Sequence, residues 1–320
     1  MKSRQIRNSM LLMLTAFIWG TAFVAQREGG DVVGPFTFNG IRSFIGSAVL
    51  LPVIVFLDKL HPSEKKLKTP EDKKRLWMGG ASCGTILFLA SSAQQLGLYM
   101  GTSAGKAGFL TACYILLVPI LSLFLKKRCG WNIWVGIVIA IAGLYLLCMT
   151  DAFRIQSSDG IVLICAVLFA VHILVVDYFS PLVDGVRMSS IQFLVCGLLS
   201  MIPMVLVDMK HSVAGITECI SRLQSWDAWM PILYAGIFSC GVGYTLQIVG
   251  QNGLNPTIAS MLMSLESVFS VFAGWIILYE TMGLRQMGGC ALIFIAILLA
   301  QIPVDKFRNK MSSDSSYMER

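Results

Sequence analysis

The chain has 320 residues, of which 56% are hydrophobic and only 13% are charged. Soluble domains carry about 25% charged residues, so this composition excludes a soluble globular protein. A helix needs about 20 predominantly apolar residues to cross a bilayer, and stretches of this kind account for most of the sequence. The net charge of +7 comes from Lys and Arg beside apolar runs. This distribution is typical of topology signals and predicts no nucleic-acid partner.

The expected fold is an all-α integral membrane protein with ten transmembrane helices, surrounded by a lipid bilayer. In chain order, the predicted helices cover residues 8–27, 35–57, 76–98, 103–125, 131–149, 159–179, 186–207, 229–251, 256–279 and 283–303. With the N-terminus inside, 18 Lys and Arg fall on the inner side and 5 on the outer side. The positive-inside rule therefore predicts that both termini are cytoplasmic, and we expect a multi-pass protein of the cell (inner) membrane. Apolar residues at helical intervals in the outer loop 208–228 predict a short helix in the membrane interface.

The predicted helices form two halves that repeat each other. Residues early in the first half recur 150 residues later, and further on the spacing becomes 153, as in the pairs Gln94 with Gln247, Gly97 with Gly250, Gly130 with Gly283 and Gly136 with Gly289. Because five crossings are an odd number, the second half starts on the opposite side of the membrane. We therefore predict two inverted five-helix repeats, residues 1–150 and 151–305, followed by a disordered cytoplasmic tail, residues 306–320.

Charged groups inside apolar helices are few, and charge at membrane depth usually faces a cavity or a partner. Glu266 lies ten residues beyond Pro256, near the middle of its helix. It is predicted to hold either the substrate or a coupling proton, or to pair with another helix. Arg42 could bind an anionic group or pair with Glu266. His172 is either a binding residue or a hydrogen-bonded packing residue, and Lys106 is either a binding residue or a side chain that reaches the interface.

Uncharged polar side chains form two stripes at helical spacing. One holds Ser92, Gln95, Tyr99 and Thr102, and the other holds Tyr244, Gln247 and Gln251. Hydrogen-bonding groups on a mostly apolar wall suit a small amphipathic solute, and the alternative is bonding between helices. The series Gly97, Gly101 and Gly105 is predicted to let the third and fourth helices pack closely.

Catalysis and metal binding have little support in the sequence. Its three histidines form no cluster with acidic residues, and neither a phosphate-binding glycine loop nor a GxSxG motif occurs. The nine cysteines contain no CxxC pair and are predicted to be small buried hydrophobic residues. We expect no enzymatic activity and no cofactor.

Three stretches resemble EamA-type carriers of the drug/metabolite transporter superfamily. They are TAFIWGTAFVAQ near the N-terminus, residues 94–124 in the first half and residues 255–300 in the second, with the acidic residue at the end of the ninth helix as Glu280. The resemblance implies a ten-helix inverted-repeat fold that exports metabolites, amino acids or drugs. Ser267 stands where many members have a proline after the acidic residue, so the resemblance gives no support for a broken ninth helix here.

The expected function is export of a small metabolite, an amino acid or related compound, by alternating access. A nucleotide-sugar or phosphate-ester type carrier is the first alternative. A non-transporting membrane receptor or scaffold, and an intramembrane enzyme, are the alternatives from other classes. The sequence predicts no particular oligomeric state.

Overall fold

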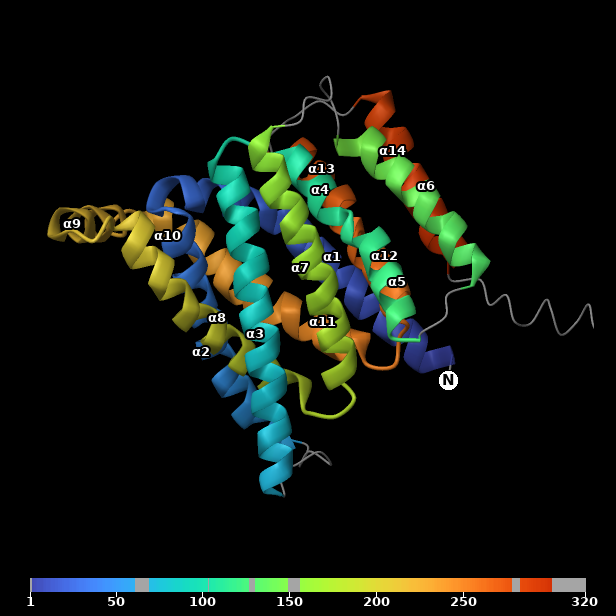
Figure 1. Cartoon of the computed structure of the whole chain (residues 1–320), viewed down its shortest axis with the longest axis horizontal. Helices are drawn as coiled ribbons and strands as arrows, with labels where there is room; N and C mark the ends of the chain where they lie inside the picture. Colours follow the sequence, from blue (N-terminus) through green and yellow to red (C-terminus); the bar gives the residue numbers. More distant parts are fainter. Residues whose placement is uncertain are drawn as a thin grey trace, which may run out of the picture.

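The computed structural model describes residues 2–60, 69–102, 104–126, 130–148, 156–277 and 283–300, and this part of the chain is helical without a strand. The first half contains α1 (Lys2–Val33), α2 (Pro35–Leu60), α3 (Pro70–Tyr99), α4 (Ala104–Ala112), α5 (Tyr114–Phe124) and α6 (Trp131–Cys148) (Figure 1). The second half contains α7 (Ser157–Phe179), α8 (Gly185–Pro203), the π-helix η1 (Met204–Asp208), α9 (Val213–Arg222), α10 (Trp226–Tyr234), the π-helix η2 (Ala235–Tyr244), α11 (Thr245–Gln251), α12 (Pro256–Met263), α13 (Leu265–Ile277) and α14 (Leu284–Ala300).

The ten predicted membrane helices are confirmed in this part of the chain. Eight of them are long and apolar enough to span a bilayer. The other two, Trp131–Leu147 and Leu284–Ala300, are shorter apolar helices, α6 and α14, which pack against each other (Figure 1). The two backbones lie so close that no larger residue fits between them. A Cβ atom on Gly143 would lie 2.8 Å from the carbonyl oxygen of Gly289, and one on Gly289 would lie 2.6 Å from that of Gly143. Small residues of this kind let transmembrane backbones approach each other.

The two halves are inverted relative to each other and pack in equivalent ways. α1 and α7, the first helices of the two repeats, run in opposite directions (Figure 1). Gly97 on α3 packs against α7, where an added Cβ would lie 2.4 Å from Val162. Its repeat partner Gly250 on α11 packs against α1, where an added Cβ would lie 3.0 Å from Leu12. The prediction that the glycine series joins the third and fourth helices was therefore wrong for Gly97.

The fourth, eighth and ninth predicted helices are interrupted, which the sequence did not predict. The fourth divides at Cys113 into α4 and α5, and the ninth divides at Ser264 into α12 and α13. At the second break the Ser264 hydroxyl donates to the carbonyl of Met261 at 2.7 Å. Back-bonding of this kind bends helices, so the break forms without a proline. In the eighth, the glycine-rich η2 lies between α10 and α11.

The predicted helix in the loop 208–228 is confirmed as α9, which projects from the edge of the bundle (Figure 1). Ser212 caps it by accepting from the backbone N–H of Gly215. Val213, at 81% exposure, Ile216 and Ile220 are exposed apolar residues of this helix, whereas Cys219 is buried. Its place in the membrane interface stays a prediction. The tail 306–320 and Glu280 lie outside the described residues.

Candidate functional site

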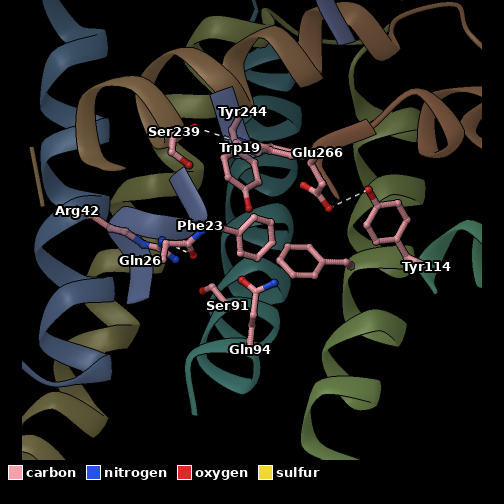
Figure 2. Close-up of a pocket in the computed structure, with 11 residues that line it drawn as sticks. Trp19, Phe23, Gln26, Arg42, Ser91, Gln94, Tyr114, Ser239, Tyr244 and Glu266 are labelled. Atoms are coloured by element: carbon pink, nitrogen blue, oxygen red, sulfur yellow. Dashed lines mark hydrogen bonds between the residues drawn. The ribbon is translucent and has the colours of Figure 1, made fainter. Parts of the chain in front are cut away.

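A small central cavity lies between the two repeats. It is lined by Trp19, Phe23 and Gln26 of α1, Arg42 of α2, Ser91 and Gln94 of α3, Tyr114 of α5, Phe169 of α7, Ser239 and Tyr244 of η2, and Glu266 of α13 (Figure 2). Its volume of about 40 Å³ has room for a few water molecules and for no larger solute. The cavity is lined by polar and aromatic side chains from both halves of the chain.

Arg42 is held at one side of the cavity by uncharged partners. Its side chain is buried, with Nη1 donating to Oε1 of Gln26 at 2.8 Å and Nη2 donating to Oδ1 of Asn39 at 2.8 Å. Nε donates to the same Asn39 oxygen at 3.1 Å, and Asn39 in turn donates to Ser91 at 2.9 Å. Among the described residues, none of the carboxylates forms an ion pair with Arg42. A guanidinium has five N–H groups, so two are not used by these three bonds.

Glu266 lies at the opposite side of the cavity from Arg42 (Figure 2). Its side chain is buried, and Oε1 accepts a hydrogen bond of 3.2 Å from the hydroxyl of Tyr114. Tyr114 is the first residue of α5 and Glu266 the second residue of α13. The two helix breaks, at Cys113 and Ser264, therefore bring a donor from one repeat to a carboxyl group of the other.

Aromatic rings fill the space between the two charged groups (Figure 2). The rings of Trp19 and Tyr244 have centroids 4.5 Å apart, and the indole N–H of Trp19 donates to the carbonyl of Ser239 at 3.4 Å. Phe23 and Phe169 complete the apolar wall. Ser239 and Tyr244 both belong to η2, and π-helical segments are frequent at functional sites. The site thus combines one cation, one carboxyl group and an aromatic surface.

Of the eight predicted site residues whose side chains the structure describes, three line this cavity: Glu266, Arg42 and Tyr244. Arg42 and Glu266 do not pair with each other, which excludes the predicted ion pair in this structure. The fully buried His172 lies behind Tyr244, with ring centroids 6.0 Å apart, and its Nε2 is 2.9 Å from Oε1 of Gln192. This geometry favours the packing interpretation of His172.

The predicted glutamines are buried outside the cavity lining. Gln95 donates to the backbone oxygen of Gln26 at 2.9 Å and so supports the residue that holds Arg42. Gln247 and Gln251 lie on α11, which packs on the first turns of α1 through Gly250. They are therefore nearer to the face of the bundle that carries the N-terminus than Tyr244 is.

Tyr99 does not join the cavity. Tyr99 ends α3, is 62% exposed and lines a separate surface hollow with Asp208 and Arg222. Ser92, Gln95 and Tyr99 all belong to α3, but Thr102 does not continue the predicted stripe, because the helix ends at Tyr99 and the chain turns at Gly101, whose φ is +101°. The side chain of Lys106 lies outside the described part of the chain.

Sequence reasoning missed eight of the lining residues, namely Trp19, Phe23, Gln26, Ser91, Gln94, Tyr114, Phe169 and Ser239. Two signals pointed toward some of them. Gln94 recurs in the second repeat as Gln247, and Trp19 with Phe23 lies at helical spacing in a segment that also recurs. Aromatic residues are common in membrane helices, however, so their type alone does not distinguish cavity walls from lipid-facing surfaces.

Comparison with known proteins gives a consistent family assignment. The sequence profile of the EamA-like transporter family matches residues 7–149 and 156–301. An uncharacterized transporter of Archaeoglobus fulgidus is 27% identical over 92% of this chain and 85% of its own length. The chloroplastic WAT1-related protein At3g02690 of Arabidopsis thaliana is 25% identical over 92% of this chain and 69% of its own. A solved crystal structure with 19% identity shares the fold, with a TM-score of 0.72 over 92% of this chain and 96% of the other.

Proposed function

Because the chain belongs to the EamA-like transporter family and is therefore a membrane transporter, we propose that it exports a small zwitterionic metabolite, an amino acid or related compound, by alternating access. The observation that carries this proposal is the central cavity, where buried Arg42 and buried Glu266 each bond to uncharged groups. A zwitterion supplies a carboxylate for the first and an ammonium group for the second. Buried charges that lack an opposite charge are costly, so a solute that pairs with both is favoured.

The aromatic wall supports a solute with an apolar portion. Trp19, Phe23 and Phe169 offer contact area, and the faces of Trp19 and Tyr244 attract a cationic ammonium group. A binding site of this kind places a few polar groups on a largely apolar surface. The cavity has to open and widen for such a solute to enter, as alternating access between two repeats requires.

The alternative carriers fit the cavity less well. A nucleotide sugar or a phosphate ester brings two or more negative charges, and Arg42 is the cationic residue among the described lining residues. Glu266 in its ionised form would repel the phosphate. A receptor or scaffold that binds no charged solute would leave both Arg42 and Glu266 without an opposite charge.

Flux into proteoliposomes tests the proposed function. We expect vesicles with the purified protein to accumulate one or more labelled neutral amino acids faster than protein-free vesicles. A sugar phosphate and a nucleotide sugar, tested in the same vesicles, are expected to stay at the protein-free rate. Preferential uptake of the phosphorylated solutes would transfer the proposal to the phosphate-ester class. A lack of flux for every solute would favour the receptor or scaffold.

Orientation is a second part of the proposal. The 18-to-5 distribution of Lys and Arg supports a protein with both termini and residues 58–75 in the cytoplasm. A green fluorescent protein fused after Arg320 is expected to fluoresce, and alkaline phosphatase at the same position is expected to be inactive. The matched control is the phosphatase fused after Gln224, in the loop predicted to be outside, where it should be active. Phosphatase activity after Arg320 would reverse the orientation.

A further inference from the structure

We propose that two symmetry-related hydrogen-bond clusters, at opposite faces of the bundle, are the gates of the transport cycle. The N-terminal gate consists of Arg4, Asn8, Ser180 and Asn252, on the face that carries the N-terminus. The opposite gate consists of Thr102, Ser158 and Asp159. The inference rests on the chain being a transporter and on its two repeats, and it does not depend on the nature of the solute.

The N-terminal gate joins three segments through one asparagine. Oδ1 of Asn252, in the turn between α11 and α12, accepts from Nη2 of Arg4 at 3.0 Å, and its Nδ2 donates to the carbonyl of Ser180 at 3.1 Å. The backbone oxygen of Asn252 accepts from Nδ2 of Asn8 at 2.8 Å. The start of α1, the end of α7 and the α11–α12 turn are therefore tied together at this face.

The opposite gate joins the end of α3 to the start of α7. The hydroxyl of Thr102, just after the α3 turn, donates to Oγ of Ser158 at 2.8 Å and lies 3.3 Å from Oδ1 of Asp159. These three side chains are buried. The turn itself is stabilised by a bond from the Thr102 N–H to the carbonyl of Gly97 at 3.1 Å.

The two gates occupy equivalent positions in the inverted repeats. Asn8 and Ser158 are 150 residues apart, the repeat spacing of α1 and α7. An added Cβ on Gly250 would lie 3.2 Å from the backbone oxygen of Asn8, and one on Gly97 would lie 3.4 Å from that of Ser158. The turn that follows α3 thus contacts α7, and the turn that follows α11 contacts α1. In each case the partner is the first helix of the other repeat.

The glycines at the two turns strengthen this equivalence. Gly101 has φ of +101° and Gly253 has φ of +85°, a left-handed conformation that favours glycine. Because α1 and α7 run in opposite directions, the two equivalent contacts lie at opposite faces of the bundle (Figure 1). The same local design therefore occurs once at each of two opposite faces of the bundle.

The bonds of both gates are formed in this structure, and the central cavity has room for only a few water molecules. Alternating access requires one side of a carrier to open while the other stays shut. An inverted repeat provides this when each half contributes one of two equivalent contacts, since breaking one leaves the other intact. The gate bonds are polar and few, so each can break and reform at a small cost in free energy.

Hydrogen–deuterium exchange of the full-length protein in detergent tests the proposal without any solute. Asn252→Ala removes the side-chain bonds of the N-terminal gate and should speed exchange in residues 4–12 by about fivefold, the effect of losing one net hydrogen bond. Residues 157–166 should exchange at the wild-type rate. Thr102→Val removes the hydroxyl of the opposite gate and should give the reverse pattern.

The matched control is Asn132→Ala on α6, which removes asparagine bonds to the carbonyls of Leu299 and Ala300, away from both gates. It should leave exchange at both gates unchanged. Asn8→Ala on α1 and Ser158→Ala on α7 remove side-chain bonds of the same two gates. They replace Asn252→Ala or Thr102→Val if either of these does not fold. Equal acceleration at both faces, or none at the mutated face, would overturn the proposal. If exchange follows the expected pattern but the protein transports no amino acid, the gate proposal stands and only the proposed solute is contradicted.

Discussion

Arg42→Gln is expected to weaken binding of the transported solute by at least roughly 30-fold, since truncating one partner of a buried charge pair costs about 2 kcal/mol or more. The guanidinium is already fixed by Gln26 and Asn39, so its free N–H groups are oriented before the solute arrives. Binding of the solute identified in the flux assay, measured by isothermal titration calorimetry in detergent, checks this prediction.

Arg42→Lys separates charge from geometry at the same position. Lysine keeps the positive charge but lacks the planar arrangement of donors that engages a carboxylate with two parallel bonds. Its affinity should therefore lie between those of the wild type and Arg42→Gln. Arg285→Gln is the matched control, because Arg285 is an exposed residue of α14 that stacks on Tyr145, and its loss should leave binding unchanged. Wild-type affinity in Arg42→Gln would remove Arg42 from the binding site.

The fold was predictable because its main signals are carried by single residues and by spacing along the chain. Hydropathy gave the ten helices, and the pairing of Gly97 with Gly250 gave two repeats whose equivalent contacts the structure contains. The breaks at Cys113 and Ser264 were not predictable, because they arise from local hydrogen bonding rather than from a proline at the break. Without those breaks, the approach of Tyr114 to Glu266 could not be inferred either.

The lining of the candidate site was predictable where a residue was chemically unusual in its surroundings. Glu266 and Arg42 were found because charge is rare inside apolar helices. Gln26 and Asn39, which hold Arg42, were missed because uncharged amides occur in many helices, and their role depends on which helices pack together. The face that a helical residue presents to a neighbour is decided by tertiary packing.

Glu266→Gln is expected to weaken solute binding by at least roughly 30-fold, since the change keeps the size of the side chain but removes its negative charge. It should also change the response to pH. In the wild type, protonation of the carboxyl group at low pH removes the partner of the ammonium group, so affinity should fall as the pH is lowered. In the variant, affinity should be low at every pH. Binding and proteoliposome flux measured across a pH series check both expectations.

Tyr114→Phe tests how the carboxyl group is held. It removes the hydroxyl that donates to Oε1 of Glu266 but keeps the ring in the cavity wall. Because Glu266 keeps its charge in this variant, the loss in affinity should be smaller than for Glu266→Gln, and the response to pH should persist. Arg42, Tyr114 and Tyr244 are the other titratable groups at the cavity, and the remaining response in this variant separates Glu266 from Tyr114.

Glu218→Gln is the matched control for Glu266→Gln, because Glu218 is an exposed carboxylate on α9 paired with Arg222 at 2.6 Å. Its loss should leave affinity, flux and the response to pH as in the wild type. If Glu266→Gln also leaves expression, flux and pH response unchanged, Glu266 has a packing role. The ammonium group of a zwitterion then has no carboxylate partner among the described lining residues. The binding surface would then consist of Arg42 and the uncharged groups around Tyr244, which favours an anionic solute over an amino acid.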